Sequence, residues 1–282
     1  MNLSLAPPTP LAYFSSLVQS DDDFPLLEAA ACLAHDEHAD LDVQQVLGQM
    51  DQLLARMRRR LAADASVLHK LRALNHFFFV DLGFGGNVND YHDPANSYLN
   101  VLLHTRRGIP VSLAVLWLEL AQGLGLSAYG VGFPGHFLVK VNLPHGQVVI
   151  DPFDGHSMTR EELEERLEPH RQRSGLHGDD ALPLSLYLQA ASGRDIIERM
   201  LRNLRDIHHT QHDPERELAV LNRLVILLPQ SWGDLRDRGL VHAQMGDLPQ
   251  ALLDLEAYVD NATDAGDVAW VTDQLRELLR QA

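Results

Sequence analysis

Three polar residues near the middle of the chain, Ser112, His136 and Asp151, have the side-chain types of an acyl-transfer triad. Ser112 opens a predicted helix, His136 begins a predicted strand, and Asp151 ends another. In such a triad the hydroxyl attacks a carbonyl carbon, the imidazole takes up the hydroxyl proton, and the carboxylate orients the imidazole. The sequence therefore predicts a site for acyl transfer at peptide or amide bonds, provided that folding brings the three residues together.

Each of these residues also has a purely structural interpretation. Serine before an apolar helix is a favoured N-cap, because its oxygen accepts a backbone N–H one turn into the helix. His136 could simply satisfy its hydrogen bonds at the start of a strand. Asp151 stands before Pro152, a pair that opens turns readily. The sequence is compatible with both interpretations.

An acyl-transfer site also needs hydrogen-bond donors for the oxyanion that develops during the reaction. The candidates are the backbone N–H of Ser112 and the side-chain amide of Asn96 or Asn100. The two asparagines could instead cap the helix that is predicted after Pro94. Their placement in the fold decides between these roles.

The elements that would position these residues are a buried helix and three strands. From Pro110 to Ala121 the chain is apolar except at Ser112 and Glu119, so the helix predicted here must be covered on every side. Gly123 and Gly125 predict its end, because glycine reaches the left-handed conformation without penalty. Strands are predicted over three short segments separated by turn residues: 128–131, 137–141 and 147–151.

The chain before this helix is predicted to be mostly helical. Apolar residues recur at helical spacing from the N-terminus to about residue 65, and again over 68–80 and 95–103. Residues 81–94 are instead polar and rich in glycine. Loops of this length inside a compact domain are often functional, so this passage is a second place to look for a site.

Four segments are long enough to compare with known families: NSYLN at 96–100, RGIPVSL at 107–113, GVGFPGHFLV at 130–139 and DPF at 151–153. Together they resemble the SirB-type bacterial family. The resemblance implies an α+β fold, with a papain/transglutaminase-like domain that includes a helical N-terminal portion. It also implies a following all-α domain of tetratricopeptide-like helices.

The same resemblance bears on the site residues. Papain-like and transglutaminase-like enzymes carry a nucleophile, a histidine and an acid or amide in this chain order, as Ser112, His136 and Asp151 do here. Those enzymes use cysteine as the nucleophile, whereas position 112 is serine. A hydroxyl residue is common at this position in the SirB-type family, so Ser112 is typical of it.

The C-terminal part is weakly repetitive at a 34-residue offset, the tetratricopeptide period. His212-Asp213 aligns with Gly246-Asp247, and Leu221 aligns with Leu255. We expect two domains: residues 1–185 form the transglutaminase-like domain and residues 192–282 the helical repeats. The boundary is expected near 180–192, where a polar segment is followed by Pro183.

Composition excludes several classes of partner. The chain carries 23 Lys plus Arg against 39 Asp plus Glu, a net charge of −16, which repels nucleic acid and anionic membranes. No apolar run approaches the ~20 residues of a membrane helix, and no secretion signal is expected from residues 1–12. The lone Cys32 suits a reducing cytoplasm. It is predicted to be a buried structural thiol, the alternative being a displaced catalytic thiol.

The fifteen histidines raise the question of a metal site. Two groups have helical spacing that could place two imidazoles on one face: His35 with His38, and His208, His209 and His212. No carboxylate or cysteine completes either group, so solvated surface histidines and no metal are expected. Residues 83–86 lack the lysine and helix start of a phosphate loop, and no cofactor is expected.

Two functional hypotheses follow. The favoured one is a cytoplasmic, non-enzymatic or weakly active regulatory protein that binds a protein or peptide through its cleft and its tetratricopeptide-like helices. The alternative is a Ser-His-Asp hydrolase or amidase, in which Ser112 attacks a peptide or amide bond, His136 transfers the proton and Asp151 orients the imidazole.

Overall fold

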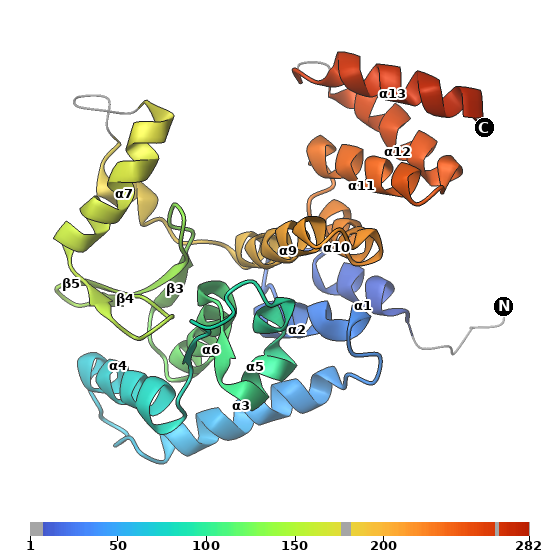
Figure 1. Ribbon diagram of the computed structural model, residues 1–282. Helices are drawn as coiled ribbons and strands as arrows, with labels where there is room; N and C mark the ends of the chain where they lie inside the picture. Colours follow the sequence, from blue (N-terminus) through green and yellow to red (C-terminus); the bar gives the residue numbers. More distant parts are fainter. Residues whose placement is uncertain (1–7, 176–181, 263–264, 282) are drawn as a thin grey trace. The chain divides into compact units, whose positions relative to one another are not determined.

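The apolar helix at the centre of the chain is α6 (Pro110–Gly123), and it is enclosed as its sequence predicts. In the computed structural model, which describes residues 8–175, 182–262 and 265–281, all side chains of α6 from Pro110 to Ala121 except Glu119 are buried. Pro110 occupies the first helical position, where its missing N–H leaves no bond unmade. Helices α2 (Leu26–Ala31), α3 (Val43–Arg58) and α5 (Leu99–Thr105) pack around it (Figure 1).

A four-stranded antiparallel sheet contacts α6 from another direction. Its strands β3 (Ala128–Val131), β4 (Leu138–Leu143), β5 (Gly146–Ile150) and β6 (Ser157–Met158) follow one another in chain order. Val131 pairs with Leu138, and Val139 pairs with Ile150. Because β3 and β4 both contact α6, the sheet brings the segments around His136 and Asp151 toward the central helix.

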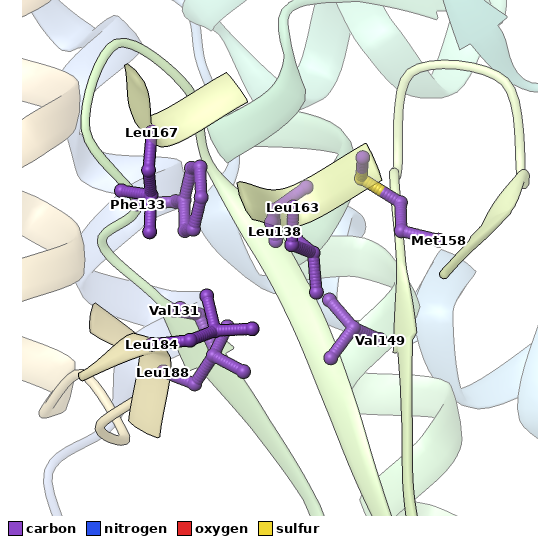
Figure 2. Packing of buried hydrophobic residues seen from close by; sticks show 9 residues of the cluster. All are labelled: Val131, Phe133, Leu138, Val149, Met158, Leu163, Leu167, Leu184 and Leu188. Atoms are coloured by element: carbon purple, nitrogen blue, oxygen red, sulfur yellow. The ribbon is translucent and has the colours of Figure 1, made fainter. Parts of the chain in front are cut away.

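The other face of the sheet is covered by α7 (Arg160–Ser174) and α8 (Leu184–Tyr187). Leu138 points away from α6 into this layer, since successive strand residues face opposite sides. Phe133 is fully buried in the same cluster and packs near Leu167 (Figure 2). The cluster consists of nine residues: Val131, Phe133, Leu138, Val149, Met158, Leu163, Leu167, Leu184 and Leu188.

The glycine-rich passage over 81–94 is only partly irregular. It follows α4 (Val67–Asn75) and a π-helical turn, η2 (His76–Asp81). Within it β1 (Gly85–Gly86) pairs in parallel with β2 (Arg107–Gly108), directly before α6. The passage ends at the 3-10 helix η3 (Pro94–Ser97), whose cap is the side chain of Asp93. Pairing with β2 therefore holds the passage beside the first turn of α6.

The helical repeats fold as predicted at the 34-residue offset. α10 (Pro214–Leu227) and α12 (Leu248–Asn261) match in length and position, and each follows a helix, α9 (Gly193–Thr210) or α11 (Trp232–Gln244). The turns between paired helices contain the aligned residues His212 and Gly246, both with positive φ. Leu221 and Leu255 are both fully buried. The array ends with α13 (Val268–Gln281).

One histidine of the repeats departs from the expectation of surface exposure. His208 is 1% exposed, whereas His209 and His212 are exposed. His208 follows Leu201 and Leu204 at the spacing that places three residues on one helix face, and both leucines are buried. The prediction of a solvent-exposed histidine is therefore wrong for His208, because this residue lies on the buried face of α9.

The compact units of the structure differ from the predicted domains 1–185 and 192–282. One unit spans Asp23–Met200, and the other combines Met1–Asp22 with Leu201–Ala282. The N-terminal helix α1 (Pro10–Leu17) belongs to the repeats because it packs on α10, with Phe14 fully buried and 5.9 Å from the Arg223 guanidinium. The other boundary falls inside α9, past the predicted stretch 180–192, of which 180 and 181 lie outside the described residues.

The remaining elements belong to the unit that spans Asp23–Met200, hereafter the first unit. Cys32 begins the 3-10 helix η1 (Cys32–Asp36) and is fully buried, as predicted for a structural thiol. The first part of α9 closes onto the same unit, where Ile196 is buried against Gly130. No helix among the described residues has both the length and the apolar character needed to cross a membrane. An α+β domain followed by helical repeats confirms the predicted fold class.

Candidate functional site

Ser112 lies in the first turn of α6, and its side chain is turned inward. It is the third helical residue rather than the N-cap, which is Ile109, because the helix begins at Pro110. The Oγ atom lies 2.6 Å from the carbonyl oxygen of Asn96, to which it donates, and accepts a hydrogen bond from the N–H of Ile109 at 3.2 Å. Ser112 is 0% exposed, so its hydroxyl is a buried bridge between two backbone segments.

Gly108 makes this bridge possible. A Cβ atom at position 108 would lie 1.9 Å from Cδ1 of Leu102, 2.9 Å from the Ser112 oxygen and 3.2 Å from the Asn96 carbonyl oxygen. Real Cβ atoms essentially never show contacts as short as the first two, and the third is tighter than most. A glycine is therefore required for the three segments to meet at the start of α6.

The side chain of Asn96 organises the neighbouring loop. Its amide nitrogen donates to the carbonyl oxygens of Asp90 and Tyr91 at 2.7 Å and 3.3 Å, and its oxygen accepts from the side chain of Asn87 at 3.0 Å. Asn96 is 3% exposed. The alternative role as a helix cap is wrong for Asn96, because Asp93 caps η3 and Asn96 lies inside that helix.

His136 and Asp151 are in direct contact. The Nε2 atom of His136 lies 2.8 Å from Oδ1 of Asp151. Because an ionised carboxylate only accepts, Nε2 carries the proton, and in the neutral imidazole Nδ1 is then the basic nitrogen. The His136 side chain is 22% exposed and that of Asp151 only 4%. The structure therefore contains the predicted pair of a histidine and its orienting acid.

Asp151 is held as an anion by its surroundings. Burial raises the pKa of the Asp151 carboxyl. The hydrogen bond and charge of His136, the N–H of Phe153 at 3.0 Å and the charge of Arg166 together have the larger, opposite effect, so the pKa lies below its usual value. Arg166, on α7, contacts the second carboxylate oxygen at 3.2 Å. Asp151 can thus orient His136 and stabilise a positive charge on the imidazole.

The glycine-rich passage contributes side chains that the triad pattern did not include. The Tyr91 ring lies 6.3 Å from the ring of Phe153, and Gly86 donates its N–H to the Phe153 carbonyl at 2.7 Å. Burial raises the pKa of the Tyr91 hydroxyl, Arg199 lowers it, and the negative charge of Asp151 raises it again, with a net increase. Tyr91 therefore lies within electrostatic range of both Asp151 and Arg199.

Among the residues that the structure describes, the other predicted site residues form no hydrogen bond to the His136–Asp151 pair. Within the described residues, no hydrogen bond joins Ser112 to His136, and the Ser112 hydroxyl bonds only to backbone atoms. Asn100 lines a pocket with residues of α3, and that pocket includes none of the three triad residues. In the described part of the chain, no group of three or more His, Cys, Asp or Glu side chains is placed to hold a metal ion.

A buried central helix, an antiparallel sheet carrying a histidine–aspartate pair, and a following helical array define a class of two-part proteins. Residues 44–202 match the transglutaminase-like superfamily, and residues 204–276 match the tetratricopeptide repeat. The chain is thus a transglutaminase-like domain joined to tetratricopeptide repeats, as the resemblance to the SirB-type family implied.

Two similar proteins show the family to which the chain belongs. The chain is 36% identical over 270 residues to a UPF0162 protein of Xylella fastidiosa (strain Temecula1), covering 95% of each chain. It is 25% identical over 258 residues to the UPF0162 protein YchA of Escherichia coli (strain K12), covering 91% of this chain and 90% of that protein. The chain belongs to this UPF0162 family. A crystal structure of menin is similar at a TM-score of only 0.43 with 11% identity, over 92% of this chain and 71% of menin, and supports no argument.

Proposed function

We propose that this protein is a non-enzymatic binding protein built on a transglutaminase-like domain, with tetratricopeptide helices that contact a protein or peptide partner. The observation that carries the proposal is the state of Ser112, which is fully buried and hydrogen-bonded to the backbone at Asn96 and Ile109. A nucleophile must reach the substrate carbonyl and must be hydrogen-bonded to its base. The Ser112 hydroxyl is instead buried and bonded to the backbone.

In this proposal the His136–Asp151 pair serves the fold. It joins the start of β4 to the end of β5, and Arg166 extends the contact to α7. Buried charged groups that are hydrogen-bonded on all sides fix the relative position of the elements that carry them. The His136–Asp151 pair and Arg166 therefore fix the position of α7 against the sheet.

The alternative function is a Ser-His-Asp hydrolase or amidase acting on peptide or amide bonds. It is favoured by one specific observation, the 2.8 Å bond from His136 to Asp151 through Nε2, which leaves Nδ1 as the basic nitrogen. For this chemistry the Ser112 side chain would have to rotate away from Asn96 and give up its bonds to the Asn96 carbonyl and the Ile109 N–H, at a cost of about 0.5–1.5 kcal/mol per bond. Those two backbone groups would keep only their direct bond of 3.4 Å to each other.

A fluorophosphonate probe separates the two functions, since it reacts with activated serine hydroxyls. We expect no labelling of the wild-type chain under native conditions. Labelling that is lost in Ser112→Ala and His136→Ala but kept in Cys32→Ala would establish the hydrolase instead. The Cys32→Ala variant controls for reaction at the thiol.

The binding role of the repeats is tested on exposed aromatic residues. Trp270 on α13 is 50% exposed, and large aromatic side chains are enriched in protein interfaces. The full-length chain is expected to retain a specific protein from a cell extract that the Trp270→Ser variant does not retain. Tyr129→Ser, at a 39% exposed position in the first unit, is the matched control. Equal recovery by all three chains, or recovery of none, would count against a partner site on the repeats.

A further inference from the structure

A polar pocket of about 830 Å³ lies in the first unit between α3, α5 and the segment that precedes α3. Ligand sites in proteins commonly have volumes of about 300–1,000 Å³. The pocket includes none of Ser112, His136 and Asp151, and all of its residues belong to the unit Asp23–Met200. Any function of this pocket is therefore separate from that of the His136–Asp151 pair and of the repeats.

One end of the pocket carries two arginines whose planar groups lie over aromatic rings. The Arg106 guanidinium is 4.6 Å from the ring centre of Phe84, and that of Arg56 is 5.7 Å from the ring centre of Phe77. An aromatic face positions a guanidinium without using its N–H groups. Among the described residues, neither guanidinium forms an ion pair with a carboxylate, so the N–H groups stay available to a ligand.

Two buried atoms of residues that line the pocket lack hydrogen-bond partners. They are Nη1 of Arg106, a donor, and Oδ1 of Asn100, an acceptor. Buried polar groups are rarely left unpaired, and each such case calls for a reason. Burial and the nearby charge of Arg56 also lower the pKa of Arg106, which is the effect expected of two cations that lack an anion between them. Because both atoms are buried, a ligand that carries an anionic oxygen and an N–H would satisfy them once the Arg106 and Asn100 side chains turn toward the pocket.

The opposite end of the pocket is acidic. It contains Glu37, Asp40 and Asp42, and Asp42 is the N-cap of α3, whereas Arg56 lies in the last turn of that helix. Fourteen residues of helix separate these two positions by about 21 Å. The pocket therefore has an acidic end and a basic end along one helix.

Between the ends, α3 presents a stripe of uncharged polar side chains. Gln45, Gln49 and Gln52 follow at spacings that place them on the same helix face as Arg56, and all three are exposed. Their side chains make no hydrogen bond to other residues in the described part of the chain. Glutamine amides offer both a donor and an acceptor, which suits the alternating N–H and C=O groups of an extended backbone.

We propose that this pocket binds a peptide of about six extended residues, with its C-terminal carboxylate between Arg56 and Arg106 and its amino end at Asp40 and Asp42. A C-terminal residue carries an amide N–H next to its carboxylate, and this N–H bonds to Asn100 Oδ1. The carboxylate receives the fork of Arg106. The peptide runs along the three glutamines of α3.

The test uses the immobilised full-length chain and a randomised hexapeptide mixture with free C-terminal carboxylates, with the same mixture amidated at the C-terminus for comparison. Retained peptides are eluted and quantified by mass spectrometry. The wild-type chain is expected to retain the free-acid mixture and not the amidated one. Arg56→Gln removes a charged hydrogen bond and is expected to reduce retention by about tenfold to a hundredfold. Asn100→Asp places a negative charge beside the bound carboxylate, and this repulsion is expected to reduce retention to a similar extent.

Arg59→Gln is the matched control, since Arg59 lies at the end of α3 outside the pocket and is exposed. It removes the same charge and should leave retention unchanged. Circular dichroism confirms that Arg56→Gln, Asn100→Asp and Arg59→Gln are folded. Equal retention of both mixtures, no retention by the wild-type chain, or an equal loss in Arg59→Gln would overturn the proposal.

Discussion

The hydroxyl of Ser112 lies 2.6 Å from the carbonyl oxygen of Asn96, so the first turn of the central helix is bonded to the 3-10 helix that ends the glycine-rich passage. The same oxygen accepts the N–H of Ile109, the N-cap residue. One serine thus bonds to two backbone groups whose direct bond to each other, from the Ile109 N–H to the Asn96 carbonyl, is 3.4 Å long. This relationship makes Ser112 first of all a structural residue.

Replacing Ser112 with alanine is therefore expected to destabilise the fold. The change removes the hydroxyl from both groups and leaves them only the direct bond of 3.4 Å from the Ile109 N–H to the Asn96 carbonyl. Losing the serine bonds is expected to cost about 0.5–1.5 kcal/mol of unfolding free energy. Urea unfolding followed by circular dichroism measures this loss. Ser185→Ala, at an exposed position on α8, is expected to change stability by less than about 0.5 kcal/mol. Equal stabilities of the two variants would contradict the structural role of Ser112.

Alanine at position 108 is expected to disturb the same junction from the other side. The added Cβ would overlap Leu102 and crowd Ser112, and overpacking of this kind costs about 1–3 kcal/mol. Gly132→Ala is the matched control, because a Cβ there meets no atom within 4 Å. Thermal unfolding of both variants gives the comparison. A Gly108→Ala chain as stable as Gly132→Ala would show that the segments are less tightly joined than described.

The buried Asp151 predicts a specific dependence of stability on pH. Its pKa is lowered in the folded protein, so its contribution to stability is fully present above the unfolded value of about 3.9 and is lost as the pH falls through the folded value. Asp151→Asn should therefore be less stable than wild type at neutral pH, by about 1–3 kcal/mol. The difference should shrink as the pH is lowered below about 4.

The measurement is the free energy of unfolding of both chains across the acid range. Asp64→Asn, at an exposed position outside the site, controls for the loss of one negative charge. A difference between wild type and Asp151→Asn that stays constant from neutral to acid pH would mean that the ionised carboxylate is not what stabilises the fold.

The turns at His212 and Gly246 are expected to respond in opposite ways when glycine is introduced at one and removed at the other. His212 has a φ of 56°, a left-handed conformation that costs a residue with a Cβ about 1 kcal/mol relative to glycine. His212→Gly is expected to raise the unfolding temperature, and Gly246→Ala, at a φ of 80°, to lower it. Differential scanning calorimetry measures both shifts. Shifts of the same sign would mean that side-chain contacts, rather than backbone conformation, control these turns.

Much of the fold follows from local sequence patterns. The apolar run of α6 requires burial on all sides, the strands are bounded by turn residues, and the 34-residue offset aligns the turns at His212 and Gly246. These features are local or periodic, so a single sequence contains them. The contact of His136 with Asp151 was also predictable, since the two residues flank adjacent strands.

Other features depend on contacts between distant segments and leave no local pattern. Arg166 lies in a helix of ordinary surface composition, and only the packing of α7 brings it to Asp151. The pairing of β1 with β2 involves two residues in each strand, too few for a periodic signal. The inward rotation of Ser112 depends on its place as the third helical residue and on the approach of the Asn96 segment, which no local pattern reveals.

Gly86 illustrates what these close contacts imply for sequence variation. A Cβ at this position would lie 2.0 Å from the ring of Phe153, whose backbone is bonded to Gly86 itself. In a saturation mutagenesis screen, position 86 should accept almost no other amino acid while Phe153 is present. Smaller residues at 153 should restore tolerance at 86, so the two positions are expected to vary together in any large collection of selected sequences.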